Sequence, residues 1–462
     1  MRSTRRDFLI SSTVAALAPA RVLSANDRVG VGFIGYGLIG RQHVHDFKRQ
    51  PDVDLVALSD VYQPRLDQGL ADCGPRAKGY ADFRRLLDDQ NVQAVVISTP
   101  DHWHAPLAML ACAAGKDVYV EKPMTLFVRE GRWMVKAAAR FKRVVQVGTQ
   151  NRSGLHYQKA RELVRAGHIG RVHTARLGSF RNVMPGFGSP PDSAPPPGLD
   201  YDMWLGPAPK RPYNKNRSLY HFRWFWDYSG GQMTNLGAHE LDIVQWFLDA
   251  EAPVAVSSSG GRLALEDNGE TPDTQDVLFE YAAGPVARVG LPELSKFTAL
   301  WSHREAGRGR AAGEGLEIFG SKGSLVISRG GFSVIPDPKG DPQNQIPRFL
   351  GHPAGGPNPQ PETRVGLWTE ALKQPATNNL LASHARNFLD CIKSRATPIA
   401  DVESGHRVAT ACHLANISLR LGRKIQWDSE KEDIIGDREA AAMLERPYRK
   451  PWDNALASLK VT

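Results

Sequence analysis

A lysine stands where an apolar run ends. Residues 117–120 read Asp-Val-Tyr-Val, and Glu121, Lys122 and Pro123 follow at once. Such a run predicts a buried strand, so the Lys122 amine is expected at a strand end, partly withdrawn from water. Desolvation disfavours the charged ammonium and suits a lysine to proton transfer. The alternative is that Lys122 is a solvated loop residue and that Pro123 merely ends the strand.

A second group with chemical potential lies in the stretch NLGAHELD. Asn235, His239 and Asp242 are separated by four and three residues, which predicts that they share one face of a helix. Histidine titrates near neutrality, and a neighbouring carboxylate can select its tautomer. The alternative is a satisfied interior histidine beside an ordinary helix acid.

A glycine pattern follows the first apolar run of the chain. The strand-like RVGVGFI leads into a loop and then a helical pattern, the context that a dinucleotide-binding motif requires. The loop consists of Gly35, Tyr36, Gly37, Leu38, Ile39 and Gly40. Gly35 permits the tight turn, and Gly37 lets a pyrophosphate approach the backbone. Gly40 allows close packing of the helix, whose N-terminus favours phosphate.

The nature of the nucleotide is indicated by Asp60. It ends the second apolar run, twenty residues after Gly40, where a carboxylate accepts hydrogen bonds from ribose hydroxyls and repels a 2′-phosphate. NAD is therefore favoured over NADP, although Arg65 nearby weakens the preference. Thr99 and Pro100 end another run, and we expect them beside the nicotinamide. That cationic ring would further disfavour a charged lysine.

The elements that must position these residues alternate between strands and helices from residue 26 to 150. The apolar runs are RVGVGFIG, DLVALSD, AVVIST, DVYV and VVQVGT, with amphipathic helical patterns between them. Short apolar strands separated by helices predict a parallel sheet covered on both faces. We therefore expect an α/β domain with a doubly wound Rossmann fold.

The pattern changes in the second part, residues 151–462. Strand candidates separated by Gly-rich turns predict an α+β domain with an open, mostly antiparallel sheet. They are VAVSSSGGRL, TQDVLFEYA, VARVGLP, GLEIFG and SLVISR. Proline-rich residues 185–212 are expected to be irregular, and residues 335–380 to form a surface insertion. Helices are predicted within 383–421, at 383–393 and 402–421, with Gly422 ending the second and both returning toward the first domain.

Bulk composition describes an ordinary globular chain of 462 residues, with 41% hydrophobic and 23% charged residues. The formal charge of +9 comes without a dense Lys/Arg block interleaved with aromatics, so no nucleic-acid partner is expected. The four cysteines lack metal-ligand spacing and favour buried free thiols.

Residues 1–25 have the pattern of a processed export signal. Arg5 and Arg6 precede Phe8 and Leu9, and a short Ala/Ser/Thr-rich stretch follows. This resembles the twin-arginine signal, which exports folded proteins, and predicts a periplasmic protein that uses the twin-arginine machinery. The alternative is a disordered basic tail.

The chain resembles the Gfo/Idh/MocA family of NAD(P)-dependent sugar and polyol oxidoreductases. The resemblance rests on GYGLIG, the TPDHWH turn and EKP after DVYV. YDMWLGPAPKRPYN, FRWFWDYSGGQMTNLGAHELDIVQW and RPYRKPW resemble its exported bacterial branch. The family likeness implies that Lys122 contacts the reacting hydroxyl and the nicotinamide, that the bond before Pro123 is cis, and that His239 is an acid/base.

The resemblance also implies the rest of the site. The DHWH turn becomes a cleft loop, which argues against a metal despite the spacing of its histidines. His104 and Glu121 thereby join the expected cofactor-binding residues, and Glu121 is a possible catalytic helper with a structural role favoured. From side-chain chemistry, aromatic faces that stack on sugars and polar groups that bond hydroxyls predict substrate contacts at Arg152, Trp204, His221, Asn235 and Asp242. The alternative is that most of the aromatic residues within 204–228 pack the domain junction, with two or three lining the site. The family often has aspartate where this chain has Asn235, so Lys122 and His239 must carry the acid/base work.

Three functions are consistent with these residues. The first is an NAD-dependent oxidoreductase acting on a hydroxyl of a sugar, glycoside or polyol. The second is a redox-neutral NAD-dependent glycosidase, in which transient oxidation acidifies a C–H, elimination breaks the glycosidic bond, and the hydride is returned. The third is a non-catalytic sugar- or nucleotide-sensing protein. The open sheet of the second domain predicts a homo-oligomer.

Overall fold

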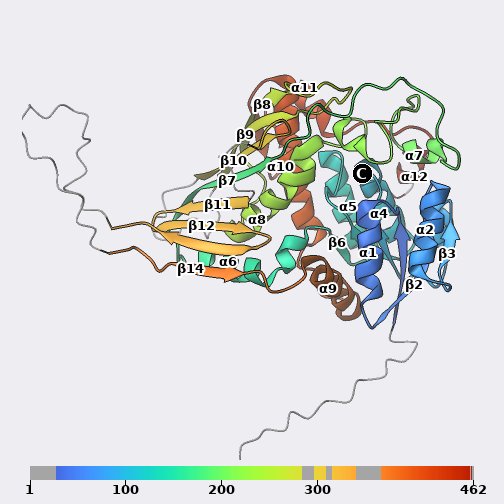
Figure 1. Cartoon of the computed structure of the whole chain (residues 1–462), viewed down its shortest axis with the longest axis horizontal. Helices are drawn as coiled ribbons and strands as arrows, with labels where there is room; N and C mark the ends of the chain where they lie inside the picture. Colours follow the sequence, from blue (N-terminus) through green and yellow to red (C-terminus); the bar gives the residue numbers. More distant parts are fainter. Residues whose placement is uncertain (1–27, 283–295, 309–314, 340–365, 458, 460–462) are drawn as a thin grey trace, which may run out of the picture.

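The first domain is a parallel six-stranded sheet with helices on both faces (Figure 1). The computed structural model describes residues 28–282, 296–308, 315–339, 366–457 and 459. The sheet order is β3-β2-β1-β4-β5-β6, and every pairing is parallel. The strands are β1 (Val29–Ile34), β2 (Val53–Ser59), β3 (Lys78–Tyr80), β4 (Ala94–Ile97), β5 (Asp117–Val120) and β6 (Val145–Val147). The helices are α1 (Leu38–Lys48), α2 (Gln63–Cys73), α3 (Phe83–Asp88), the 3₁₀ turn η2 (Asp101–Trp103), α4 (His104–Ala113) and α5 (Val128–Phe141).

The predicted doubly wound fold is confirmed. Every residue of β1, β4, β5 and β6 is buried, as expected for strands covered on both faces. The sequence analysis did not predict β3 and α3. Both are short, and β3 is a largely exposed, polar edge strand, so it has no apolar run to reveal it.

The second domain is built around a ten-stranded mixed sheet, counted over the described residues, in the order β14-β13-β12-β11-β7-β10-β9-β8-β15-β16. Its pairings are antiparallel except for β7 with β10, which are parallel. The strands are β7 (Val172–Phe180), β8 (Ala255–Gly261), β9 (Thr274–Ala282), β10 (Lys296–Arg304), β11 (Gly315–Gly320), β12 (Gly323–Ser328), β13 (Gly331–Pro336), β14 (Leu372–Pro375), β15 (Ile425–Asp428) and β16 (Asp433–Ile434). The expected mostly antiparallel sheet is confirmed.

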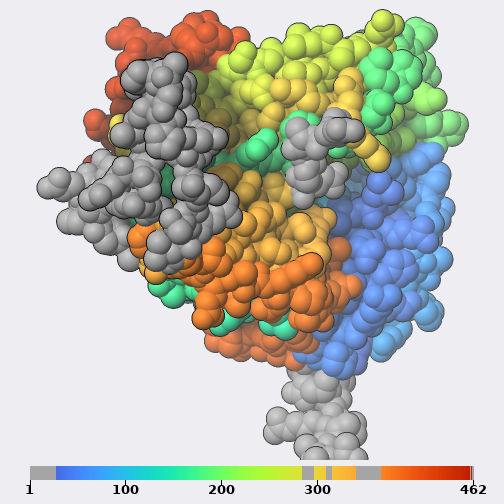
Figure 2. Space-filling model, turned by 60° about the vertical axis from the view of Figure 1, so that its left-hand side comes forward, coloured from blue at the N-terminus to red at the C-terminus, as the bar shows by residue number. Residues whose placement is uncertain are grey.

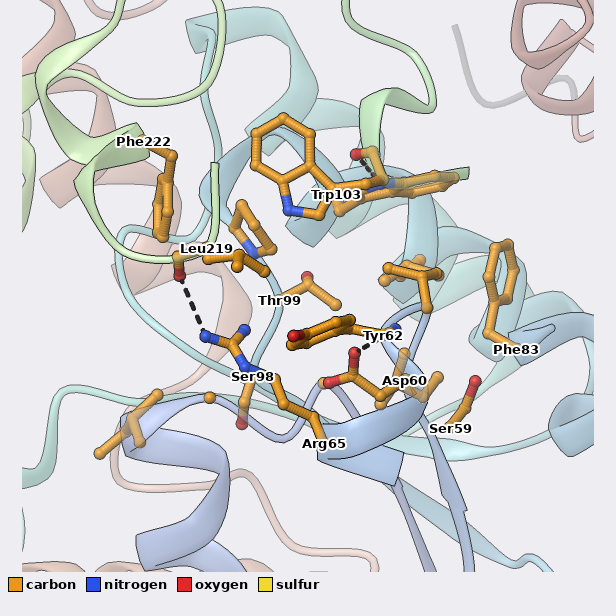
Figure 3. Close-up of a pocket in the computed structure, with 18 of the residues that line it drawn as sticks. Ser59, Asp60, Tyr62, Arg65, Phe83, Ser98, Thr99, Trp103, Leu219 and Phe222 are labelled. Carbon is orange, nitrogen blue, oxygen red and sulfur yellow. Dashed lines mark hydrogen bonds between the residues drawn. The ribbon is translucent and has the colours of Figure 1, made fainter. Parts of the chain in front are cut away.

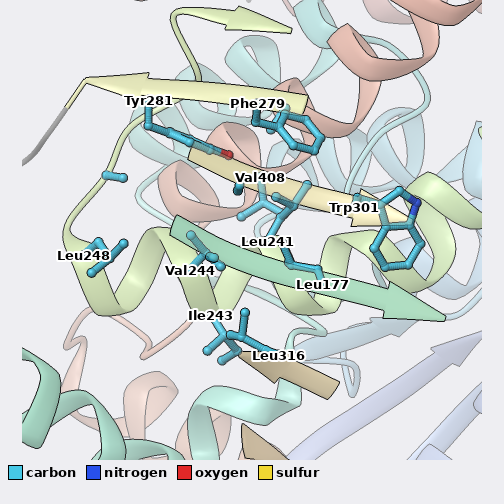
Figure 4. Packing of buried hydrophobic residues seen from close by; sticks show 14 of the residues in the cluster. Leu177, Leu241, Ile243, Val244, Leu248, Phe279, Tyr281, Trp301, Leu316 and Val408 are labelled. Carbon is cyan, nitrogen blue, oxygen red and sulfur yellow. The ribbon is translucent and has the colours of Figure 1, made fainter. Parts of the chain in front are cut away.

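The helical elements of the second part of the chain pack partly against this sheet and partly against the first domain. They are the 3₁₀ turn η3 (Gln150–Ser153), α6 (Leu155–Arg165), α7 (Tyr201–Leu205), the 3₁₀ turn η4 (His221–Trp224), the π-helical turn η5 (Met233–Gly237), α8 (Ala238–Leu248), α9 (Leu380–Ser394), α10 (Val402–Leu421), α11 (Arg438–Ala441), the 3₁₀ turn η7 (Ala442–Leu444) and α12 (Trp452–Ala457). Figure 4 shows α8 beneath the sheet, with Leu241 and Val244 among buried strand residues such as Leu177. This apolar packing fixes the position of α8 relative to the strands.

Two segments differ from their predicted irregular structure. Residues 185–212 contain α7, because the Asp200 side chain accepts a hydrogen bond from the Met203 N–H and begins a helix. Within 335–380, β14 pairs with β13 at the sheet edge. The predicted strand in VARVGLP and the predicted signal at 1–25 lie outside the described residues.

The last two long helices return to the first domain. Asn379 and Asp401 cap α9 and α10, and Gly422, at φ 64°, ends α10 as its sequence predicts. α9 packs against α1, and α10 packs against α5. In Figure 2 the orange surface of the C-terminal third adjoins the blue surface of the first domain.

Two simple findings complete the fold. Each of the four cysteines is buried with a free thiol, as predicted. None of the helices in the described part of the chain is long and apolar enough to cross a membrane.

The return of α9 is reinforced by Asp52, a buried carboxylate at the start of β2. Arg386 donates to it at 2.6 and 2.9 Å, and Lys393 also binds it. Burial alone would raise the pKa of Asp52, but these two cations lower it to about 2.

We predict that Asp52→Asn lowers the free energy of unfolding by about 1–2 kcal/mol at pH 7, because the cations are partly exposed and screened. The lowered pKa means that wild-type stability from this cluster is present above about pH 4 and is lost as pH falls toward 2. Urea unfolding from pH 7 to pH 2.5 measures it, and the variant's difference from wild type should shrink toward pH 2.5. Asp390→Asn is the matched control, because Asp390 is an exposed partner of the same Arg386. An equal loss in both variants would contradict the prediction.

Candidate active site

The glycine loop between β1 and α1 has the shape that a dinucleotide requires. Gly35 has φ +91°, and a Cβ there would lie 2.8 Å from the Ser98 carbonyl oxygen. A Cβ at Gly40 would lie 2.2 Å from the Gly35 oxygen, so the helix packs closely on the loop. A Cβ at Gly37 would have only the Arg65 guanidinium within 4 Å, at 3.9 Å. The backbone at Gly37 therefore faces open space that a pyrophosphate fits.

Asp60 lies at the end of β2, beside this loop. Its oxygens accept hydrogen bonds from the Tyr36 N–H at 2.7 Å and the Tyr62 N–H at 2.9 Å. Burial raises the pKa of Asp60, while these N–H groups and Arg65 oppose the shift. The expected contact of Tyr36 with the cofactor is wrong for its side chain, which is buried and donates its hydroxyl to Asp72.

A cleft runs from the glycine loop to the second domain (Figure 3). Its lining from the first domain includes Gly35, Gly37, Leu38, Ile39, Asp60, Arg65, Thr99, Pro100 and Trp103. The second domain contributes Trp204, Leu219, Tyr220, Phe222 and Arg223. Seven of the twelve predicted cofactor residues thus line one cleft, and the aromatic segment at 219–223 borders it.

Five of the twelve expected cofactor residues do not line this cleft: Tyr36, Gly40, His104, Glu121 and Lys122. The ring nitrogens of His104 are 2.9 Å from the Thr99 carbonyl and 2.6 Å from the Pro123 carbonyl, so His104 ties two loops together. Glu121 is buried and pairs with the His43 ring at 2.7 Å. Burial alone would raise the pKa of Glu121, but His43 and nearby cations lower it. His104 and Glu121 support the site from behind.

Lys122 projects from the loop after β5 toward the second domain. The Lys122–Pro123 bond is cis, as the resemblance implies. Its Nζ donates to the Asn235 carbonyl and to Asn235 Oδ1, both at 2.8 Å. Burial, against the opposing charge of Glu121 and with smaller effects from Arg223 and Arg329, lowers the pKa of Lys122 to about 8. A substantial fraction of the amine is therefore neutral near physiological pH and able to accept a proton.

His239 lies in the first turn of α8 and lines a separate cavity of about 500 Å³. Burial and the nearby Lys122 and Arg329 hold the pKa of His239 well below its usual value. The ring is thus a neutral acid/base group near Lys122. The other lining residues include Asn151, Tyr157, Ser179, Arg181, Glu240, Ser328 and Arg329.

Arg152 and Asp242, both expected to bind substrate, form an ion pair with each other. Both side chains are buried, and Arg152 donates to the Asp242 carboxylate at 2.7 to 3.0 Å. Neither residue lines the two cavities. A buried ion pair of this kind satisfies its own charges and joins η3 to α8.

Of the clustered aromatic residues, Trp204, Tyr220 and Phe222 line the cofactor cleft, in keeping with the expectation that only two or three would line the site. Trp204 lines the cofactor cleft and packs against Tyr228, with ring centroids 4.9 Å apart. His221 stacks on Phe187 at 4.6 Å and lines neither cavity. Arg329, which lines the His239 cavity, could not be predicted as a site residue from the sequence. It is one basic residue before a Gly-Gly turn, with no periodic pattern around it.

Comparison with known proteins is decisive for the family. Residues 29–149 match the Gfo/Idh/MocA oxidoreductase model for an NAD-binding Rossmann fold, and residues 181–284 and 365–454 match the C-terminal alpha/beta domain model. Together these matches cover more than half of the chain. The chain belongs to the Gfo/Idh/MocA family of NAD-binding oxidoreductases. The family match agrees with the open backbone at Gly37 and the carboxylate of Asp60.

Individual relatives cover the chain to different extents. Myo-inositol 2-dehydrogenase of Thermotoga maritima is 27% identical over 410 residues, 88% of this chain and 99% of its own. A glycosyl hydrolase family 109 protein of Shewanella baltica (strain OS195) is 32% identical over 169 residues, 35% of this chain and 36% of its own. The WlbA dehydrogenase of Bordetella pertussis, solved with NADH and UDP-GlcNAcA, shares the fold with a TM-score of 0.60 at 18% identity, covering 87% of this chain and 99% of its own.

We predict that Lys122→Met lowers turnover by about 10²–10⁴-fold, because the proton acceptor is removed. Its affinity for NAD, measured by tryptophan fluorescence, should stay close to wild type, since Lys122 does not line the cofactor cleft. In the oxidative direction, wild-type kcat/KM should fall as pH drops below about 8, because the amine becomes charged.

Lys393→Met is the matched control, because Lys393 is a partly exposed lysine at the distant Asp52 cluster. Its turnover should match wild type. Full activity in Lys122→Met would remove the lysine from the mechanism.

Proposed function

We propose that this protein is an NAD-dependent oxidoreductase that acts on a hydroxyl of a sugar, glycoside or polyol. The observation that carries the proposal is the position of Lys122. Its amine has a pKa lowered to about 8 and lies near His239, which lines one cavity. The next residue, Pro123, is linked through His104 to Thr99, which lines the cofactor cleft. The similarity to the Thermotoga myo-inositol 2-dehydrogenase over nearly its full length supports a polyhydroxylated substrate.

The residues of this chain divide the work as follows. NAD, when bound, accepts or returns a hydride at its nicotinamide ring. Lys122 takes up the hydroxyl proton at Nζ, and His239 offers a neutral imidazole in the substrate cavity. Asn235 holds the amine in place through two hydrogen bonds. The aromatic segment 219–223 excludes water from the cofactor cleft.

A redox-neutral glycosidase is the second candidate. The similarity to the Shewanella glycosyl hydrolase family 109 protein favours it, although that match spans only about a third of either chain. Export offers a second reason. We propose that residues 1–25 are a twin-arginine signal for a periplasmic protein, and a cofactor carried out within a folded protein would have no ready replacement. A non-catalytic sensor is the third candidate, opposed by the presence of both Lys122 and His239.

We also propose that the protein is a homo-oligomer that pairs through the outer face of the large sheet. Leu278 and Leu300 lie directly opposite each other on β9 and β10 and are 37% and 43% exposed. They border a hollow of about 600 Å³ on that face. Leu300→Glu should convert the assembly to monomers in analytical ultracentrifugation. Thr298→Glu, a charge on a neighbouring partly exposed position of β10, tests whether position 300 is special.

The decisive experiment uses the purified mature protein and no added cofactor. Its absorbance spectrum is recorded, and it is incubated with a panel of nitrophenyl glycosides. An oxidoreductase should release no nitrophenol, but should produce reduced nicotinamide, absorbing near 340 nm, when NAD and free sugars or inositols are supplied.

Nitrophenol release with bound NAD recovered unchanged would overturn the oxidoreductase proposal in favour of the redox-neutral glycosidase. Neither signal, with NAD and sugar binding intact, would favour the sensor. Lys122→Met is run in parallel, because either enzymatic signal must disappear in it.

A further inference from the structure

A chain of polar side chains leads from Lys122 to a fully buried carboxylate. Asn235 Nδ2 donates to Gln232 Oε1 at 3.0 Å, and Gln232 Nε2 donates to Glu305 Oε1 at 3.0 Å. At the other end, Lys122 Nζ donates to Asn235 Oδ1 at 2.8 Å. Glu305 has no exposed surface.

The Glu305 carboxylate determines how each side-chain amide in this hydrogen-bonded chain is oriented. Besides Gln232, its other partners are the Arg181 guanidinium and the Trp224 indole at 2.7 Å, and both can only donate. Glu305 therefore requires the NH₂ of Gln232 to face it, which leaves Gln232 Oε1 toward Asn235. The NH₂ of Asn235 must then face Gln232, and its oxygen must face Lys122. An amide alone has no such preference, because its oxygen and nitrogen ends are similar in shape.

The fold brings these partners together from separate elements. Arg181 and Glu305 directly follow β7 and β10, the parallel pair of the large sheet, so their side chains meet at one sheet edge. Gln232 and Asn235 lie at the start of and within η5, immediately before α8. Arg181 also lines the His239 cavity, so one carboxylate organises both that wall and the amine.

We propose that Glu305 and Gln232 are positioning residues that hold the Asn235 oxygen toward Lys122. The importance of this role for turnover rests on the proposed function. Its direct effect, however, is on the protonation state of the Lys122 amine. An acceptor oxygen favours the ammonium form, whereas a reversed amide would place N–H groups against it. Loss of the chain therefore lowers the pKa of Lys122.

The test measures that pKa without any substrate. The rate at which acetic anhydride labels Lys122 is followed against pH by peptide mass spectrometry. The midpoint of this pH profile gives the pKa of the Lys122 amine. In Glu305→Gln the midpoint should move down by about half a pH unit or more, because the amides can reverse. Trp224→Phe is the matched control: it removes another bond to the same carboxylate and leaves the chain intact, so its midpoint should match wild type.

A second variant covers the possibility that Glu305→Gln does not fold. Gln232→Leu breaks the chain while leaving the Glu305–Arg181 pair, and it should produce the same downward shift. NAD binding verifies that each variant is folded. An unchanged midpoint in folded Glu305→Gln or Gln232→Leu overturns the proposal.

The polarity is tested separately by a double-mutant cycle. Asn235→Asp can only accept from Gln232, which forces the Gln232 oxygen against Glu305. Glu305→Gln supplies a donor there, so the loss in the unfolding equilibrium constant for the double variant should be about tenfold smaller than the product of the single losses. If the loss in the double variant equals the product of the two single losses, the proposed orientation of the amides is wrong. These readouts need no turnover, so a protein that oxidises no sugar but shows these shifts would refute the proposed function alone.

Discussion

The bond between Lys122 and Asn235 is the constraint on which the rest of the site depends. A buried amine has a lowered pKa only while its neighbours do not restore the charge, yet a buried N–H group needs an acceptor. Asn235 meets both demands, because it offers two neutral oxygens at 2.8 Å. A carboxylate at the same distance would stabilise the ammonium and raise its pKa. The asparagine therefore keeps the amine anchored and still able to act as a base near pH 8.

The same bond joins the two domains, so it requires them to keep a fixed relative position. Three groups of ion pairs help to keep that position. They are Asp52 with Arg386 and Lys393, Asp117 with Arg395, and Arg132 with Glu403 and Glu432. Each joins the first domain to a helix or turn beyond residue 380. None of these residues lines the cofactor cleft, so the ion pairs join the domains without occupying the site. A shift of about an ångström at Lys122 would break its paired hydrogen bonds.

Most of the first domain was predictable because its chemistry belongs to the backbone. Glycines at 35, 37 and 40 are required by turn, approach and packing, and these demands are visible in sequence. Side-chain partners are different. The spacing around His239 predicted its helix, but Asp242 is engaged by Arg152, ninety residues earlier in the chain, and no local pattern shows that. Tyr36 was misplaced for a related reason: its loop position predicts contact with a nucleotide, while a core contact with α2 takes the ring. Glu305 and Gln232 could not be predicted as partners, because they are 73 residues apart in sequence and meet only where η5 packs against the sheet.

What separates a dehydrogenase from a redox-neutral catalyst is not the pair of Lys122 and His239, since both reactions begin by removing the same hydroxyl proton. The difference lies in whether the cofactor leaves between turnovers. In this structure the cleft is enclosed by the segment at 219–223, yet the polar tie across it is slight, a 3.4 Å contact from Arg65 to the Leu219 carbonyl. Leu219, Tyr220 and Phe222 therefore close this side of the cleft mainly with apolar surface. Retention then depends on how readily this segment opens, and the type of reaction is decided by the enclosing segment as much as by the acid/base residues.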